Sequence, residues 1–205
     1  MKFERFQVTE TDVQTVSELL YESNREILQY AFGKKKKTAQ KRIKKLIRIG
    51  KNHYGYKNIY AVYVGKTMAG FFIGYTGKEQ EERKEQTDFF TFLKLMSAYG
   101  ILKYRLFVRP LFMNISLVDM RNDDFYIDDI LLNQKYQHND IESFLFKKAV
   151  ECAKDNGCKR IVTDISLAKP EKKEYYESIG FSVYDKKTER VHGNIIGNYL
   201  MRYLL

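Results

Sequence analysis

The residues from 124 to 185 constrain the fold most, because strand-like and helix-like segments alternate there with clear boundaries. Gly157 and Gly180 favour the ends of two helices, and Pro170 favours a helix start, where its missing N–H costs nothing. The segments are a strand at 124–132, a helix from 141 to 156, a strand at 160–166 and a helix from 170 to 180. This alternation predicts an α/β fold.

The flanking segments extend this pattern to about seven strands in a mixed sheet. Residues 3–8 alternate like a short strand, and Thr9 to Asp12 supply N-cap oxygens for a following helix. Gly65-Lys66 favours a tight hairpin turn, since glycine adopts a positive φ without strain. The other elements are a helix from about Arg25, a basic helix after Gly33, the hairpin within 58–77, and strands at 181–185 and 197–205.

The stretch 78–120 differs in composition from its neighbours. A charged run, KEQEERKEQ, precedes a long apolar and aromatic segment whose side chains need burial. Arg109-Pro110 favours a helix end, because proline disfavours a helical conformation in the residue before it. We therefore expect a helical insertion at 78–120, packed against a single domain that spans 1–205.

The net charge of +10 comes from one local segment. Residues 33–59 contain eleven Lys or Arg and no acid, so the rest of the chain carries a net charge of −1. Such a segment, from Lys34 to Lys57, could attract a nucleic acid, an anionic lipid surface or a phosphorylated cofactor. It is also compatible with an ordinary solvated helix face, because apolar residues recur beneath the lysines at Ala39, Ile43, Leu46 and Ile47.

Composition predicts a cytoplasmic protein with no membrane span and no metal. The chain is 44% hydrophobic, but no apolar run approaches the ~18 residues of a membrane helix, and the N-terminus MKFERFQVTETD is charged. Cys152 and Cys158 lack the spacing of metal ligands and are typical of buried thiols in a reducing compartment.

The chain resembles the GNAT acetyltransferases in its order of elements and in two motifs. FYIDDILLNQKYQ is similar to the strand and turn before that family's pyrophosphate loop, and PEKKEYYESIGF is similar to its late helix, which ends in Tyr-x-x-x-Gly-Phe. The early REILQYAFG and the insertion also resemble a subgroup. The resemblance implies a mixed sheet with a splayed central strand pair, flanking helices, and the insertion between the third and fourth strands.

The resemblance further implies acetyl-CoA as cosubstrate. The pantetheine arm would pair with Ile130, Leu131 and Leu132, and the pyrophosphate would lie at the following helix N-terminus, where free N–H groups and the helix dipole attract anions. The family's phosphate loop corresponds to Gln137, His138, Asn139, Asp140, Ile141 and Glu142, and its cofactor-contacting asparagine corresponds to Lys169.

This loop departs from the family at Asp140 and Glu142, which stand where the family has glycine. A carboxylate there could cap the helix itself, and its charge would repel pyrophosphate by more than about 1 kcal/mol. Nearby lysines of the basic segment could compensate for this repulsion if the chain folds that way.

The resemblance assigns Tyr176 as the general acid that protonates the departing CoA thiolate; a packed core aromatic is the other interpretation. Asp128 and Asp129 face opposite sides of their strand by its period of two. The resemblance favours Asp128 as the candidate general base, because it falls on the side where related enzymes place such groups. Structural pairing of Asp128 with Lys or Arg is equally compatible. The histidines at 53, 138 and 192 are scattered, and no nucleophile is expected.

These observations predict an N-acetyltransferase in which a primary amine attacks acetyl-CoA directly. The alternative is a GNAT-fold binding or regulatory protein that has lost acetyl-CoA, as Asp140 and Glu142 suggest. The expected partner is a small-molecule or peptide amine; a homodimer is compatible, and nucleic acid is disfavoured because no base-reading motif accompanies the charge.

Overall fold

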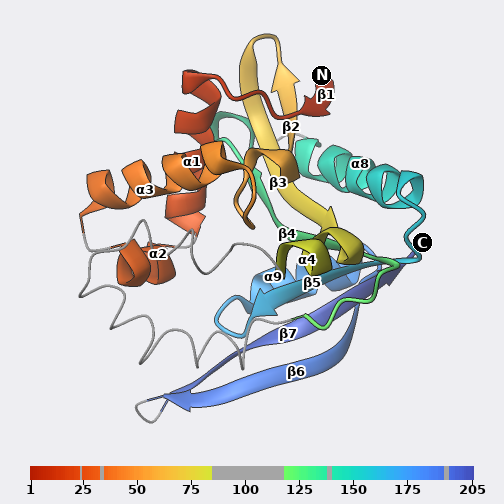
Figure 1. Cartoon of the computed structure of the whole chain (residues 1–205). Helices are drawn as coiled ribbons and strands as arrows, with labels where there is room; N and C mark the ends of the chain where they lie inside the picture. Colours follow the sequence, from red (N-terminus) through yellow and green to blue (C-terminus); the bar gives the residue numbers. More distant parts are fainter. Residues whose placement is uncertain (24, 33–34, 85–117, 138–139, 192–193) are drawn as a thin grey trace.

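The computed structural model describes residues 1–23, 25–32, 35–84, 118–137, 140–191 and 194–205. In these ranges seven strands form one mixed sheet, in the order β1-β2-β3-β4-β5-β7-β6 (Figure 1). The strands are β1 (Lys2–Arg5), β2 (Ile59–Val64), β3 (Thr67–Thr76), β4 (Asp124–Leu132), β5 (Arg160–Ser166), β6 (Ser182–Val191) and β7 (Asn194–Leu204). The helices are α1 (Glu10–Ser23), α2 (Arg25–Phe32), α3 (Lys36–Ile49), α4 (Gly77–Lys84), α8 (Ile141–Asp155) and α9 (Pro170–Ser178), with short 3-10 turns η1 (Tyr56–Asn58) and η3 (Gln134–Tyr136).

The predicted α/β order is confirmed, but three predicted strands have different bounds. The first strand ends at Arg5 instead of Val8, because a turn in which the Thr9 N–H donates to the Gln7 carbonyl (2.8 Å) directs the chain into α1. The last two strands are longer than predicted. Backbone pairing between β6 and β7 continues from Ser182 to Val191. The paired segment therefore includes charged residues, which lack the apolar alternation by which a strand is predicted.

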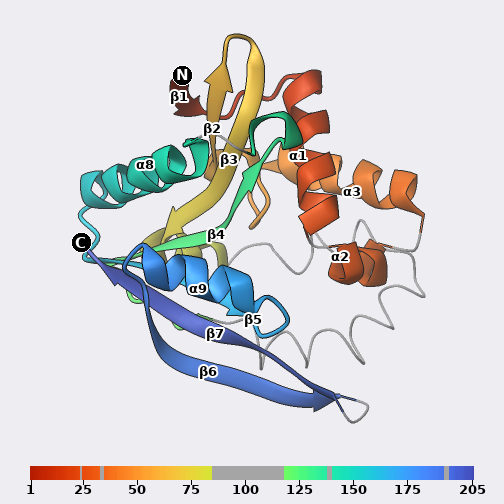
Figure 2. The same ribbon diagram turned by 180° about the vertical axis from the view of Figure 1, so that it is seen from behind.

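Helices cover both faces of the sheet (Figures 1 and 2). Along β2, Ile59, Ala61 and Tyr63 belong to the core formed with α1, α2 and α3, whereas Tyr60 and Val62 belong to the core formed with α8 and α9. This alternation follows from the two-residue period of a strand. We refer to the first side as the α1–α3 face and to the second as the α8–α9 face.

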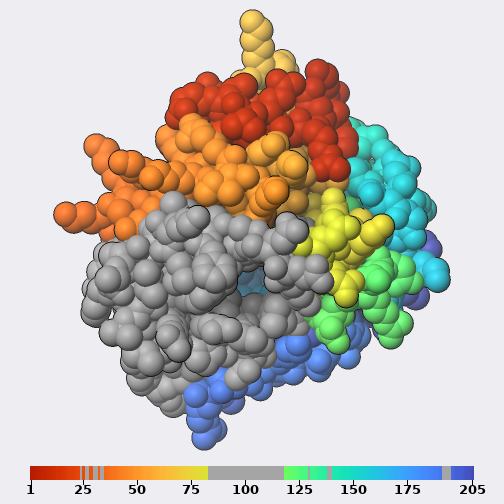
Figure 3. Space-filling model, viewed as in Figure 1, coloured from red at the N-terminus to blue at the C-terminus, as the bar shows by residue number. Residues whose placement is uncertain are grey.

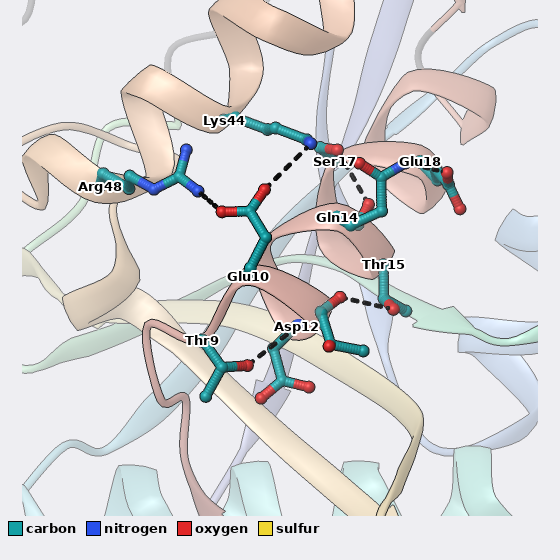
Figure 4. A network of polar contacts seen from close by, with 10 residues as sticks. Thr9, Glu10, Asp12, Gln14, Thr15, Ser17, Glu18, Lys44 and Arg48 are labelled. Carbon is teal, nitrogen blue, oxygen red and sulfur yellow. Dashed lines mark hydrogen bonds and ion pairs between the residues drawn. The ribbon is translucent and has the colours of Figure 1, made fainter.

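The basic helix α3 docks on α1 through both apolar and charged side chains. Its predicted stripe is buried, with Ala39, Ile43, Leu46 and Ile47 at most 1% exposed. Glu10, in the first turn of α1, accepts from Lys44 Nζ (3.4 Å) and from the Arg48 guanidinium (Figure 4). Figure 4 also shows the predicted N-cap, in which the Thr9 hydroxyl accepts from the Asp12 N–H at 3.1 Å. In Figure 3 the residues of α1 (red) and α3 (orange) lie next to one another in the upper part of the view.

The two central strands separate after three residue pairs. β4 and β5 run parallel, and their register is Asp124↔Arg160, Phe125↔Ile161 and Tyr126↔Val162. Beyond this point β4 continues alongside β3, and β5 continues alongside β7. The predicted splayed pair is therefore confirmed.

A β-bulge in β4 lies next to the point of separation. Gly74 pairs with Ile127 and Phe72 with Ile130, so β4 has one residue more than β3 in this interval. The simple period of two is therefore interrupted at Asp128 and Asp129. Tyr126 and Leu131, on either side of the bulge, both join the α1–α3 core.

The predicted insertion at 78–120 begins as a helix, α4, which opens with a capping box. Glu79 accepts from the Thr76 N–H (2.8 Å), and the Thr76 hydroxyl accepts from the Glu79 N–H (3.1 Å). Residues 118–120 are not helical, and the remainder of the insertion, including Arg109-Pro110, lies outside the described residues. Among the described helices, none has the length and apolar character needed to span a membrane.

The docking of α3 yields a prediction about stability. Ile43→Ala should lower the free energy of unfolding by about 2–5 kcal/mol, because it leaves a cavity at a side chain that is only 1% exposed. Lys41→Ala, on the exposed face of the same helix, should change it by less than about 0.5 kcal/mol. Urea denaturation followed by circular dichroism measures both variants, and equal effects would contradict this mode of docking.

Candidate active site

The loop between α3 and β2 presents His53 to the sheet. Two buried asparagines close the loop: Asn52 Nδ2 donates to the Leu46 carbonyl (2.7 Å), and Asn58 Nδ2 donates to the carbonyls of Asn52 (2.8 Å) and His53 (3.0 Å). Gly50 ends α3 with φ +76°, a conformation that favours glycine. At Gly55 a Cβ atom would lie 2.3 Å from the Gly50 carbonyl oxygen, so only glycine permits this close approach.

His53 joins β3 to β4 through its two ring nitrogens. Nε2 lies 3.0 Å from Asp128 Oδ2, and Nδ1 lies 3.1 Å from the Tyr75 hydroxyl. The side chains of His53 and Asp128 are 27% and 24% exposed, so both are accessible in part. The Asp128 carboxylate therefore pairs with a histidine, a partner that the sequence did not suggest, and the charges of Lys172 and Lys169 act on it as well.

A second carboxylate lies on the neighbouring strand, on the far side of the separation. Asp164 of β5 accepts from the Tyr126 hydroxyl (2.5 Å) and from Asn198 Nδ2 (2.7 Å). Tyr54 packs edge-on against His53, with 4.6 Å between ring centroids. We call this group the acid–aromatic cluster; its members are His53, Tyr54, Tyr75, Tyr126, Asp128 and Asp164.

The two carboxylates differ in their electrostatic surroundings. Burial is the main cause that raises the pKa of Asp164 to about 6. The negative charge of Asp128 raises this pKa further, whereas the hydrogen bond from Tyr126 lowers it. Burial alone would also raise the pKa of Asp128, but the charge and hydrogen bond of His53, with Lys172 and Lys169 nearby, lower it. Asp128 is therefore the carboxylate that stays ionised over the wider pH range.

A groove of about 860 Å³ lies between α1, the end of β4 and the start of α8. Five of the residues predicted to bind the cofactor line it: Ile130, Leu131, Leu132, Gln137 and Glu142. Lys36, the first residue of α3, lines the same groove and is paired with Glu22 of α1 (2.5 Å). The fold thus brings one lysine of the basic segment to the predicted phosphate loop.

The remaining loop residues differ in how they contribute. Asp140 is exposed and stands at the N-cap of α8, but its side chain makes no capping hydrogen bond, so it does not occupy the helix end. Ile141 is 1% exposed and packs in the core, which leaves only its backbone for a ligand. His138 and Asn139 lie outside the described residues.

Of the two acids of the predicted phosphate loop, Glu142 lines the groove, as do Glu18 and Glu22 of α1. Burial and the nearby Glu142 carboxylate raise the pKa of Tyr175 to about 12, which places this carboxylate beside α9. A negative charge therefore lies where the resemblance implies a phosphate.

Tyr176 and Lys169, the two predicted site residues of α9 and its N-cap, have different surroundings. Tyr176 is 2% exposed and packs against Phe181, with 5.0 Å between ring centroids, in the α8–α9 core. It therefore lies on the opposite side of the sheet from the Asp128–His53 pair. Lys169 Nζ donates to the carbonyl of Ser23 (3.2 Å), a residue that lines the groove.

Sequence reasoning missed His53, Tyr75, Tyr126 and Asp164. The histidine is far from Asp128 in the chain, so no local spacing relates them. Asp164 did offer a signal, because an acid inside the apolar run RIVTDIS is unusual for a buried strand. Within the described ranges, no three His, Cys, Asp or Glu side chains converge closely enough to hold a metal ion.

The raised pKa of Asp164 predicts how stability depends on pH. The folded protein holds this proton up to a pKa of about 6, whereas an unfolded aspartate titrates near ~3.9, so the folded state binds more protons between these values. Stability from this group therefore falls as pH rises from about 4 to about 7, by on the order of 1–3 kcal/mol. The urea midpoint of the wild type should fall as pH rises over this range, and the midpoint of Asp164→Asn should not. If the midpoints of both proteins change with pH in parallel, the prediction is contradicted.

No protein-family model matches the sequence, and no curated protein matches it. Solved structures, however, are similar over the whole chain. An acetyltransferase has a TM-score of 0.69 at 16% identity, covering 100% of this chain and 99% of that one. An N-acetyltransferase from Staphylococcus aureus Mu50 has a TM-score of 0.69 at 15% identity, with 98% and 100% covered.

A third similar structure, from Desulfovibrio desulfuricans, is assigned to the GNAT acetyltransferase family. It has a TM-score of 0.58 at 12% identity and covers 99% of this chain and 98% of its own. Similarity at this level of identity establishes a fold. With the order of strands and the separation of β4 from β5, it shows that this chain has the GNAT fold.

Proposed function

We propose that the protein is an N-acetyltransferase that transfers the acetyl group of acetyl-CoA to a primary amine. The arrangement along β4 supports this most. Ile130 to Leu132 line the groove, and Asp128 stands just before them at the bulge, beside the gap between β4 and β5. The surface for the cofactor and Asp128, one member of the proton-accepting pair, are thus adjacent on β4.

The residues of the groove suit a long phosphorylated ligand. Beyond Tyr126, no described strand pairs with the edge of β4 that faces β5, so backbone groups there are available to the amides of a pantetheine arm. The groove volume of about 860 Å³ lies in the range of ligand sites. Lys36 would supply a positive charge near Gln137, and the first N–H groups of α8 would supply donors.

The opposite placement of the proposed catalytic residues suits acyl transfer. Bound acetyl-CoA supplies the activated thioester. The amine nitrogen attacks the thioester carbonyl carbon from the α1–α3 face, and its proton passes to the pair formed by Asp128 and His53. Tyr176, on the α8–α9 side, would give its proton to the sulfur as the C–S bond breaks, since a phenol with an ordinary pKa of ~10 is a donor at neutral pH.

The alternative function is a GNAT-fold binding or regulatory protein that no longer binds acetyl-CoA. Its support is Glu142, because a carboxylate in the groove repels a pyrophosphate at close range. The absence of a side-chain cap from Asp140 favours the enzyme, since this residue does not compete for the helix N–H groups.

Isothermal titration with acetyl-CoA distinguishes the two functions. An enzyme should bind it with a micromolar Kd, and Glu142→Gln, which removes the charge at equal size, should tighten binding about 5- to 10-fold, as expected for a repulsion of about 1 kcal/mol. Lys36→Gln should weaken binding several-fold. If the wild type does not bind and the double variant with glycine at positions 140 and 142 does, the alternative function is correct.

The role of Asp128 is tested by its isosteric amide. Asp128→Asn should reduce kcat for acetyl transfer to a primary amine by about 10²- to 10⁴-fold, because the pair loses its anion, while the Kd for acetyl-CoA stays unchanged. Asp123→Asn serves as control, since Asp123 lies before β4 and pairs with Lys159 and Arg160. An unchanged kcat in Asp128→Asn would remove Asp128 from the mechanism.

A further inference from the structure

Three side chains from three separate elements form a continuous hydrogen-bonded chain in the acid–aromatic cluster. Tyr75 of β3 contacts His53 Nδ1 (3.1 Å), and His53 Nε2 contacts Asp128 Oδ2 (3.0 Å) at the bulge of β4. The Tyr75 side chain is buried, at 6% exposure, and its ring lies 5.7 Å from that of His53. Packing thus fixes the hydroxyl relative to the imidazole.

The direction of these hydrogen bonds follows from the ionised state of Asp128. A carboxylate only accepts hydrogen bonds, so the His53 Nε2–H donates to it. In neutral histidine the other ring nitrogen then lacks a proton, and Nδ1 accepts from the Tyr75 O–H. The chain therefore runs from the Tyr75 hydroxyl through the imidazole to the carboxylate.

We propose that this chain is a proton relay for the reaction, in which His53 is the final proton acceptor and Tyr75 passes the amine's proton to it. As the amine nitrogen bonds to the acetyl carbon, its N–H proton moves to the Tyr75 oxygen, and the Tyr75 proton moves to His53 Nδ1. The imidazolium that forms is held by Asp128, which stays ionised. This inference rests on the proposed function and changes the role of Asp128 from base to anionic partner.

The physical reason for assigning His53 as the proton acceptor is that the ordinary pKa of histidine lies close to neutral pH. A general base works best when its pKa lies near the operating pH, and histidine is the side chain whose ordinary pKa is closest to it. Asp128, whose pKa is lowered, is a weak base but a strong partner for a cation. A third group that orients the base is the usual arrangement of such relays.

Other charged and titratable groups around His53 come from several elements. Tyr54 belongs to its own loop, Tyr126 lies on β4, Asp164 acts from β5, and Lys169 and Lys172 act on the Asp128 carboxylate from the start of α9. The carboxylates favour an imidazolium and the lysines oppose it. The pH dependence of kcat is therefore compared between the wild type and variants in which these surrounding groups are unchanged.

The test combines kinetics with a measurement that needs no turnover. Tyr75→Phe and His53→Gln should each lower kcat with a primary amine by about 10²-fold or more and flatten its rise with pH. The double variant should be no worse than either single one, because the residues act as a unit. Tyr184→Phe, which removes the hydroxyl of a tyrosine on β6 that lies outside the acid–aromatic cluster, is the matched control.

In the resting wild type, ¹⁵N NMR should show the His53 ring protonated on Nε2 and not on Nδ1 at neutral pH. A ring protonated on Nδ1 overturns the relay whether or not the protein is active.

Two kinetic outcomes separate the relay from the proposed function. Normal kcat in His53→Gln, whose amide can still donate to Asp128, shows that His53 only orients Asp128. Normal kcat in Tyr75→Phe shows that the proton does not pass through Tyr75. Either result overturns the relay while acetyl transfer stands. Absence of acetyl transfer to any amine by the wild type contradicts the proposed function itself, and with it the relay.

Discussion

The separation of β4 from β5 is the constraint on which the rest of this structure depends. The parallel ladder ends at Tyr126↔Val162, and each strand then follows another neighbour. Had pairing continued in this register, the gap beside Ile130 to Leu132 would be filled by β5. Near this point the Thr163 hydroxyl donates to the Asp128 carbonyl oxygen at 3.4 Å. Both the free strand edge and the acid–aromatic cluster result from this opening.

The basic segment has a structural role that its charge alone would not indicate. Lys44 and Arg48 hold Glu10, and the apolar stripe beneath them anchors α3 to the core, so much of the segment serves helix docking. This docking has two consequences for the site. It places Lys36 in the groove, and it delivers the loop that carries His53 to the centre of the sheet.

The groove combines features that favour and oppose an anionic cofactor. Lys36 and the uncapped start of α8 favour one, whereas Glu142 lines the same space with a negative charge. Lys36 is already paired with Glu22, so a phosphate would have to compete with a carboxylate for it. Under the proposed function, affinity for the cofactor depends on a balance among exposed charges, and such charges are screened by salt. This balance separates the two functions that the fold allows.

By itself, the sequence determined the order of elements, the hairpin at Gly65, the cap at Thr9, the helix start at Pro170 and the buried stripe of α3, because each depends on residues close together in the chain. It also pointed to Asp128 and to the β4 end of the groove. Only the tertiary structure decided that Asp128 pairs with His53, 75 residues away, and that Asp164 lies across the gap. The bulge in β4 was equally non-local, whereas the β6–β7 pair joins consecutive strands and was underestimated because its charged residues lack the apolar alternation of a strand. Local patterns specify periodicity, whereas partners between distant strands and loops are selected by packing, which no short stretch of sequence contains.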